Sequence, residues 1–178
     1  NKEKVMGSFP GGTVVRVTPT LSTDAYASGD VLFVATRIPN AVKNRGGVSK
    51  LSAMFILDSS DNSDADNDIF FVFQEKEGTA VGSINGAANI SSADLVNNKV
   101  LGHAMMNAGH SGTAGSIVNS RLFYAFPASG DGESSTPNLM LKADEGSTDV
   151  YVWAYLSGGT PTYAADSLEL IFHIEYID

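Results

Sequence analysis

Apolar and polar residues alternate with a period of two over much of this chain, which is typical of strands that bury one face. Residues 168–176 show this most clearly, because every second residue from Leu168 to Tyr176 is apolar and those between are mostly polar. Residues 150–156 alternate as well. They carry three large aromatics on one face and aliphatic residues on the other. Each of these segments is predicted to be a strand that lies against a core.

Two other segments, residues 31–36 and 69–73, are apolar without alternation, as expected for strands covered on both faces. Residues 51–57 also read as a strand. Between 51–57 and 69–73 lies an acidic turn rich in Asp, Asn and Ser, whose side chains bond to nearby backbone and stop ladders. The simplest interpretation is a hairpin of these two strands.

A helix start is predicted at Ser91 or Ser92, with Asp94 in the first turn, where a carboxylate suits the positive end of the helix dipole. Short strands separated by turns, without a βαβ rhythm, predict an all-β fold. The expected architecture is an antiparallel β-sandwich, jelly-roll-like, with one short helix. Residues 1–12 are expected to form an N-terminal arm and residues 13–178 a single domain. The remaining predicted strands are 13–20, 80–84, 100–106, 117–126 and 139–142.

Composition narrows the classes of function. The absence of cysteine excludes disulfides and thiolate metal sites. A net charge of −9 argues against nucleic acid as a partner, because that binding depends on Lys and Arg at phosphates. No apolar run reaches the roughly 18 residues of a membrane span. A protein partner is therefore expected.

The sequence offers no convincing catalytic or metal constellation. The three histidines are scattered along the chain, without the spacing of a zinc or iron site. Four acidic residues match positions of a calcium loop, but Ile69 stands where that loop needs glycine. Acidic pairs suited to glycoside hydrolysis lie in Gly/Ser-rich turns. No enzyme activity, metal or cofactor is predicted. These candidates are His103, His110 and His173; Asp64, Asp66, Asp68 and Glu75; and Asp131/Glu133 and Asp144/Glu145.

Two sets of residues are candidates for interaction. The aromatic face formed by Tyr151, Trp153 and Tyr155 is interpreted as core or subunit interface, with a glycan-stacking platform as the alternative. Four of the eleven cationic residues lie in or beside the loop 38–47 of this acidic protein. They form either a docking patch for an acidic protein partner or ordinary solvated surface. These cationic residues are Arg37, Lys43, Arg45 and Lys50.

An ordered series of short motifs runs through the chain: residues 25–30 (AYASGD), 38–41 (IPNA), Gly46-Gly47, Leu57-Asp58, Phe70-Phe71, 82–85 (GSIN), Ile90-Ser91 and Leu101-Gly102. Over residues 13–175 this series resembles a group of tailed-phage virion proteins, familiar from marine phages and described as structural, capsid-associated or head-decoration proteins. The resemblance implies a β-rich fold and a role in assembly, without a catalytic residue.

On that basis we expect a capsid decoration protein on the outer surface of the head, with the major capsid protein as its partner. The alternative is a receptor- or glycan-binding module of a head protrusion or tail fibre. Exposed strand edges would have to be covered by neighbouring subunits, so a homo-oligomer is expected, and a trimer is one arrangement that would do so.

Overall fold

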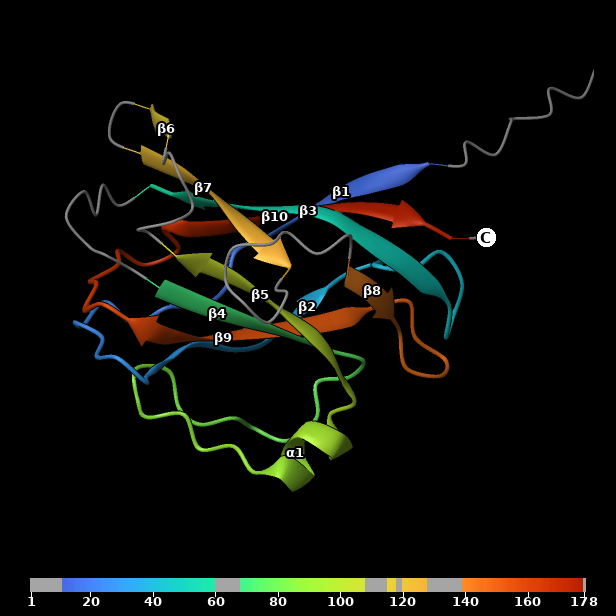
Figure 1. Ribbon diagram of the computed structural model, residues 1–178, viewed down its shortest axis with the longest axis horizontal. Coiled ribbons are helices and arrows are strands. Elements are labelled where there is room, and N and C mark those ends of the chain that lie inside the picture. Colours follow the sequence, from blue (N-terminus) through green and yellow to red (C-terminus); the bar gives the residue numbers. More distant parts are fainter. Residues whose placement is uncertain (1–10, 60–67, 108–114, 118–119, 128–138, 178) are drawn as a thin grey trace, which may run out of the picture.

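The computed structural model describes residues 11–59, 68–107, 115–117, 120–127 and 139–177. The described chain forms two antiparallel four-stranded sheets packed face to face, with one short helix (Figure 1). This confirms the predicted all-β sandwich. Most of the predicted arm, most of the acidic turn and residues 128–138 lie outside the described residues.

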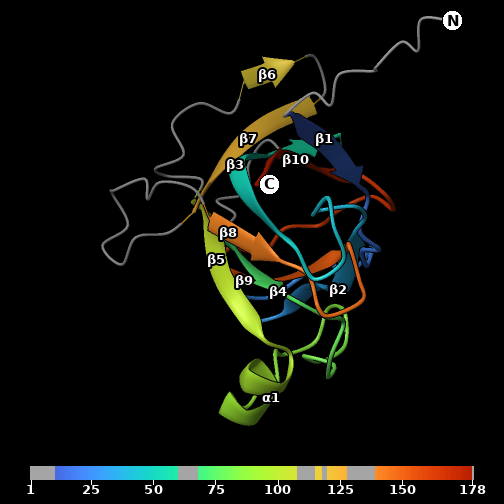
Figure 2. The same cartoon turned by 90° about the vertical axis from the view of Figure 1, so that its right-hand side faces the viewer.

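The first sheet has the strand order β1-β10-β3-β7 and the second the order β5-β4-β9-β2. The two sheets meet along one side, where Ala104 and Met105 of β5 pair with Pro127 and Phe126 of β7. Figure 2 shows the sheets as two layers, with α1 beyond the second. The strands are β1 (Gly12–Val17), β2 (Val31–Ile38), β3 (Val48–Asp58), β4 (Asp68–Gln74), β5 (Val100–Asn107), β6 (Gly115–Ile117) on β7, β7 (Ser120–Pro127), β8 (Leu139–Lys142) on β3, β9 (Val150–Gly158) and β10 (Leu168–Tyr176).

The main core lies between the two sheets and takes the inward face of each strand. Phe73 of β4 and Phe172 of β10 meet there, with ring centroids 6.0 Å apart and ring planes at 82°. Both side chains are fully buried. The alternation directs the aliphatic positions of β9 and the apolar positions of β10 into this core, as their sequence predicts.

A second, smaller apolar cluster covers the outer face of the second sheet. Val31, Val72, Val81 and Trp153 form it. Residues 79–90, named here the cover segment, supply Val81 together with Ala88 and Ile90 and lie over β2, β4 and β9. Because of this segment, β2 and β4 are apolar on both faces, as the unbroken runs 31–36 and 69–73 predicted.

The helix α1 (Ser92–Asn97) follows the cover segment and begins as predicted. The Ser91 hydroxyl accepts from the Asp94 backbone N–H, and the Asp94 carboxylate accepts from the Ser91 N–H, which together form a capping box. At the other end, the buried Asn98 side chain accepts from the N–H of Thr79 at 2.6 Å and donates to its carbonyl at 3.0 Å. These bonds attach the start of the cover segment to the end of the helix.

Three local predictions are wrong. Residues 80–84 form no strand, because this part of the cover segment crosses over the sheet and makes only one bridge, between Ile84 and Val31. Residues 117–126 are not one strand, since Ile117 pairs with Ser120 and the chain reverses between β6 and β7. The predicted hairpin of β3 and β4 does not form either. β3 pairs with β10 on one side and with β7 and β8 on the other, so β4 lies in the opposite sheet.

Candidate functional site

The predicted aromatic face of β9 lies on the outer face of the second sheet, and its three members differ in accessibility. Trp153 is only 2% exposed, and its indole Nε1 donates to the Gln74 side-chain oxygen at 3.1 Å. Tyr151 and Tyr155 are half-buried. The Trp153 ring therefore fills the cluster beneath the cover segment, and the two tyrosines are the members that a partner or a sugar can reach.

Tyr155 belongs to a longer aromatic row that crosses three strands. Its ring lies 5.2 Å from Phe70 of β4, and Phe70 stacks on His103 of β5 at 4.5 Å, with ring planes 12° apart. Phe70, His103 and Tyr155 are all half-buried. Sequence reasoning missed Phe70 and His103 as members of this row. The alternation places each residue on a face, but only the β4 pairings with β5 and β9 bring them together.

Burial lowers the pKa of His103 from its ordinary value of 6.5. Because the folded-state pKa lies below the unfolded value, this site favours folding above pH 6.5, and that contribution is lost as the pH falls through the folded-state pKa. We expect the melting temperature to fall more between about pH 7.5 and pH 5 in the wild type than in His103→Phe, which keeps an aromatic ring on Phe70. Equal decreases in thermal melts at the two pH values would contradict this.

The four predicted docking cations do not form one patch. Arg37 lies opposite Tyr151 at the end of β2, on the outer face of the second sheet, and its guanidinium is 3.5 Å from the Asp149 carboxylate. Lys50 lies on β3 of the first sheet, with its Nζ 2.6 Å from Glu175. Lys43 and Arg45 are exposed in the loop between these two strands. Lys43 and Arg45 are therefore the two of the four that lie together on one exposed loop, which makes them the candidates for contact with an acidic partner.

The loop that carries Lys43 and Arg45 is firmly held. Its backbone bonds to residues 147–149: the Asn40 N–H to Asp149 Oδ1 at 2.9 Å, the Val42 N–H to the Thr148 carbonyl at 3.1 Å, and the Gly46 N–H to the Ser147 carbonyl at 2.8 Å. The side chains of Ala41 and Val42 are buried in the main core. The two cationic side chains are thus presented on a fixed backbone, which lowers the conformational entropy that docking would cost.

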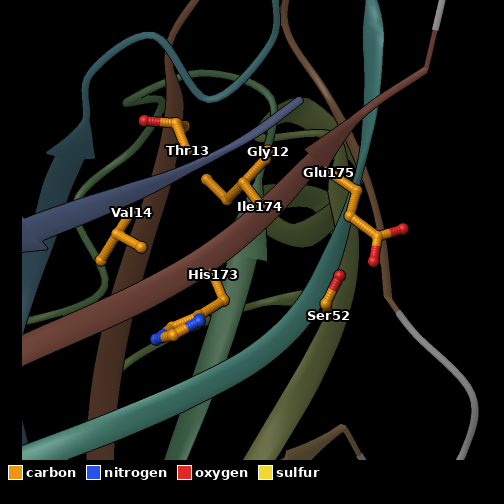
Figure 3. Close-up of a pocket in the computed structure, with 7 residues that line it drawn as sticks. All are labelled: Gly12, Thr13, Val14, Ser52, His173, Ile174 and Glu175. Carbon is orange, nitrogen blue, oxygen red and sulfur yellow. The ribbon is translucent and has the colours of Figure 1, made fainter. Parts of the chain in front are cut away.

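A shallow cavity of about 260 Å³ lies on the outer face of the first sheet, over β1, β10 and β3 (Figure 3). His173, Glu175 and Ser52 all line it. The Glu175 carboxylate bonds to Lys50, which lowers the pKa of Glu175, and it points away from the His173 ring. His173 instead lies edge-on to Phe55, with ring centroids 5.4 Å apart. The three side chains therefore do not form a nucleophile–base arrangement.

The remaining acidic candidates are separated by the fold. Asp68 begins β4 and Glu75 follows its last residue, so the strand holds these two calcium-template positions apart; Asp64 and Asp66 lie outside the described residues. Asp144 pairs with Lys99 at 2.5 Å, while Glu75 lies 3.0 Å from Lys142 and 3.4 Å from Lys99. Asp131, Glu133 and His110 are also outside the described part. Within that part, no three metal-ligating residues gather.

Comparisons with known proteins add no relative. No protein-family model matches the chain, and no curated protein matches its sequence. Among the described residues, no helix is long and apolar enough to cross a membrane.

Proposed function

We propose that this chain is a non-enzymatic virion structural protein of a tailed phage, which binds the outer surface of the head through the major capsid protein. The motif series of residues 13–175 supports this proposal, together with a β-sandwich whose buried apolar residues pack into two clusters. The observation that carries it is the fixed loop 40–47, which presents Lys43 and Arg45 from an otherwise acidic protein.

Decoration would stabilise the head by mass action. A protein that binds the assembled shell, and not its separated subunits, stabilises the shell at each site by RT ln(1 + L/Kd), where L is its free concentration and Kd its dissociation constant for the shell. Charge complementarity between the loop and an acidic shell would fix the orientation of the docked sandwich and raise the association rate. The protein would then act on the capsid surface of the virion, as a homo-oligomer and without nucleic acid, membrane or cofactor.

Neutralising the loop tests this docking. The variant Lys43→Gln/Arg45→Gln is expected to bind undecorated heads at least tenfold more weakly than the wild type, because two charge-assisted contacts on a fixed backbone are lost. Leu95→Glu/Val96→Glu, on the exposed side of α1, lowers the net charge equally and serves as the control. Saturable binding would be followed by co-sedimentation with heads. Equal occupancy by the loop variant and the wild type would remove the loop from the interface.

A second candidate function is glycan or receptor binding by a head protrusion or tail fibre. The half-buried row of Phe70, His103 and Tyr155 favours it, because flat rings that remain partly exposed can stack on the apolar face of a sugar. Binding of the isolated protein to host cells or to a glycan array, abolished by Tyr155→Ala, would support this function over decoration.

We also propose that the sandwich is a jelly roll. The orders β1-β10-β3-β7 and β5-β4-β9-β2 support this, since most connections cross from one sheet to the other, as two interleaved Greek keys require.

A further inference from the structure

The strands β1 and β2 stand at the two ends of the strand order, and they differ in whether their outer edges are covered. The edge of β2 is blocked at its start by the cover segment, where the Val31 N–H donates to the Gly86 carbonyl at 2.8 Å and the Asn85 N–H donates to the Val31 carbonyl at 2.9 Å. Beyond Val31, the register of β2 shifts twice, and such irregularities blunt an edge. In contrast, β1 pairs with β10 in unbroken register from Gly12 to Val17, and no described residue pairs with its other edge.

The direction of the β1 backbone groups follows from one bond. The Tyr176 N–H donates to the Gly11 carbonyl at 3.4 Å, so Gly11 and the odd-numbered residues that follow direct their backbone groups toward β10. The N–H and C=O groups of Gly12, Val14 and Arg16 therefore point to the open edge. The side chains of these residues lie on the outer face of the sheet, where Val14 is 53% exposed.

We propose that this edge pairs with β1 of a second copy of the chain, antiparallel and about a two-fold axis through Val14. In this register Val14 lies opposite Val14 of the second copy, and Arg16 lies opposite Gly12. Side chains on the outer face of one copy lie beside side chains on the outer face of the other, so the first sheet continues across the axis. The backbone groups of Gly12, Val14 and Arg16 in the two strands together form about six hydrogen bonds. The two valines then cover each other's exposed side chains, and no like charges meet.

The cavity in Figure 3 fits this pairing, because it lies where the Arg16 side chain of the second copy would extend. Gly12 lies between that arginine and Glu175 across the strands, and it has no side chain to obstruct the path. A larger residue is not accommodated at this position, because a Cβ there would clash with the Ile174 carbonyl oxygen. Gly12 and Glu175 are direct neighbours in the β1–β10 ladder. The guanidinium can therefore pass over Gly12 toward the Glu175 carboxylate and share it with Lys50, giving one intermolecular ion pair on each side of the axis. Within one copy of the chain, Arg16 pairs with Glu169 at the exposed surface. Such a surface ion pair contributes little free energy, so Arg16 can leave Glu169 and pair with Glu175 of the second copy.

A second copy is favoured as the occupant by this charge complementarity and by symmetry. A head-to-tail ring built on β1 would need a different regular edge of similar length on the same chain. The blocked and irregular β2 does not supply one, and among the other described strands with one unpaired edge, β6 has three residues and β8 has four. A two-fold contact uses one edge twice. It buries a small area, so the dimer is expected to be weak and dependent on concentration.

Proline at position 14 tests the pairing without attacking the fold. Val14→Pro removes an N–H that points to the open edge and leaves the bonds from β1 to β10 in place, a position at which an edge strand accepts proline. Sedimentation velocity from about 10 μM to 1 mM should show the wild type moving from 18.7 kDa toward twice that mass, with Val14→Pro associating at least tenfold more weakly and melting within a few degrees of the wild type. Val14→Lys, which places two ammonium groups together on the axis, is a second variant. Val96→Lys, at a 75% exposed position on α1, is its matched control.

The Arg16 contact has its own test in the same assay. Arg16→Glu should weaken the dimer about tenfold by bringing a carboxylate toward Glu175, whereas Arg16→Lys should retain it. A wild type that stays at monomer mass over the whole range would overturn the proposal, as would Val14 variants that associate as strongly as the wild type. Equal association of Arg16→Glu and Arg16→Lys would overturn the placement of Arg16 in the cavity.

Discussion

Replacing Phe172 with alanine is expected to destabilise the protein by about 3–5 kcal/mol, the usual cost of removing a fully buried ring. Phe172 lies in the middle of β10 and meets Phe73 of the opposite sheet edge-to-face at 6.0 Å. Its removal would leave a cavity between the sheets, and both strands are fixed by neighbours on each side, which limits collapse. Urea denaturation followed by far-UV circular dichroism measures the change.

Phe55 of β3 provides the matched control for this substitution. Its ring is half-buried on the outer face of the same sheet, against His173. Phe55→Ala should cost less than about 2 kcal/mol, because much of that ring already contacts water. If the two alanine variants lost the same free energy of unfolding, the main core would not lie between the sheets as described.

Replacing Trp153 with alanine is expected to cost a similar amount, about 3–5 kcal/mol, but through a different part of the molecule. The Trp153 ring is the largest member of the cluster that joins the cover segment to the second sheet. Its indole also satisfies the Gln74 side-chain oxygen, which would lose its donor while remaining buried. Amide hydrogen exchange of residues 81–90 should accelerate in the variant more than exchange in β3 or β10.

Trp153→Phe separates the packing of the ring from its hydrogen bond. This variant keeps most of the apolar contact and loses only the indole donor, so it should retain most of the protection of residues 81–90 and cost about 1–3 kcal/mol. Unchanged exchange of residues 81–90 in Trp153→Ala would show that the cover segment is held without the tryptophan, contrary to this account.

The sequence predicted the strands better than it predicted their partners. Alternation in β10 and continuous apolar runs in β2 and β4 depend on which faces are covered, and this is a local property of the chain. Pairing depends on competition among distant strands. β3 pairs with β10 and β7 rather than with β4, and the apolar pattern within residues 51–73 does not specify those distant partners. The strand predicted at residues 80–84 does not form, because Val81 packs in the outer cluster, whereas Ile84 is only partly buried and packs against the main core.

For the candidate sites too, the sequence predicted the local features and missed the contacts between distant strands. The common face of Tyr151, Trp153 and Tyr155 could be predicted from their spacing, but the burial of Trp153 depends on a segment about 70 residues earlier in the chain. The row with Phe70 and His103 required the register of three strands. Likewise, the cations of the predicted patch could be counted from the sequence, whereas the pairing of Lys50 with Glu175 joins β3 to the end of the last strand.

The most direct test of the proposed function is a cryo-electron microscopy map of phage heads incubated with the purified chain. The account predicts density for the β-sandwich at regularly repeated positions on the outer surface of the head, with loop 40–47 turned toward the capsid protein. Heads that remain bare at saturating protein, or density confined to the tail and its fibres, would contradict it.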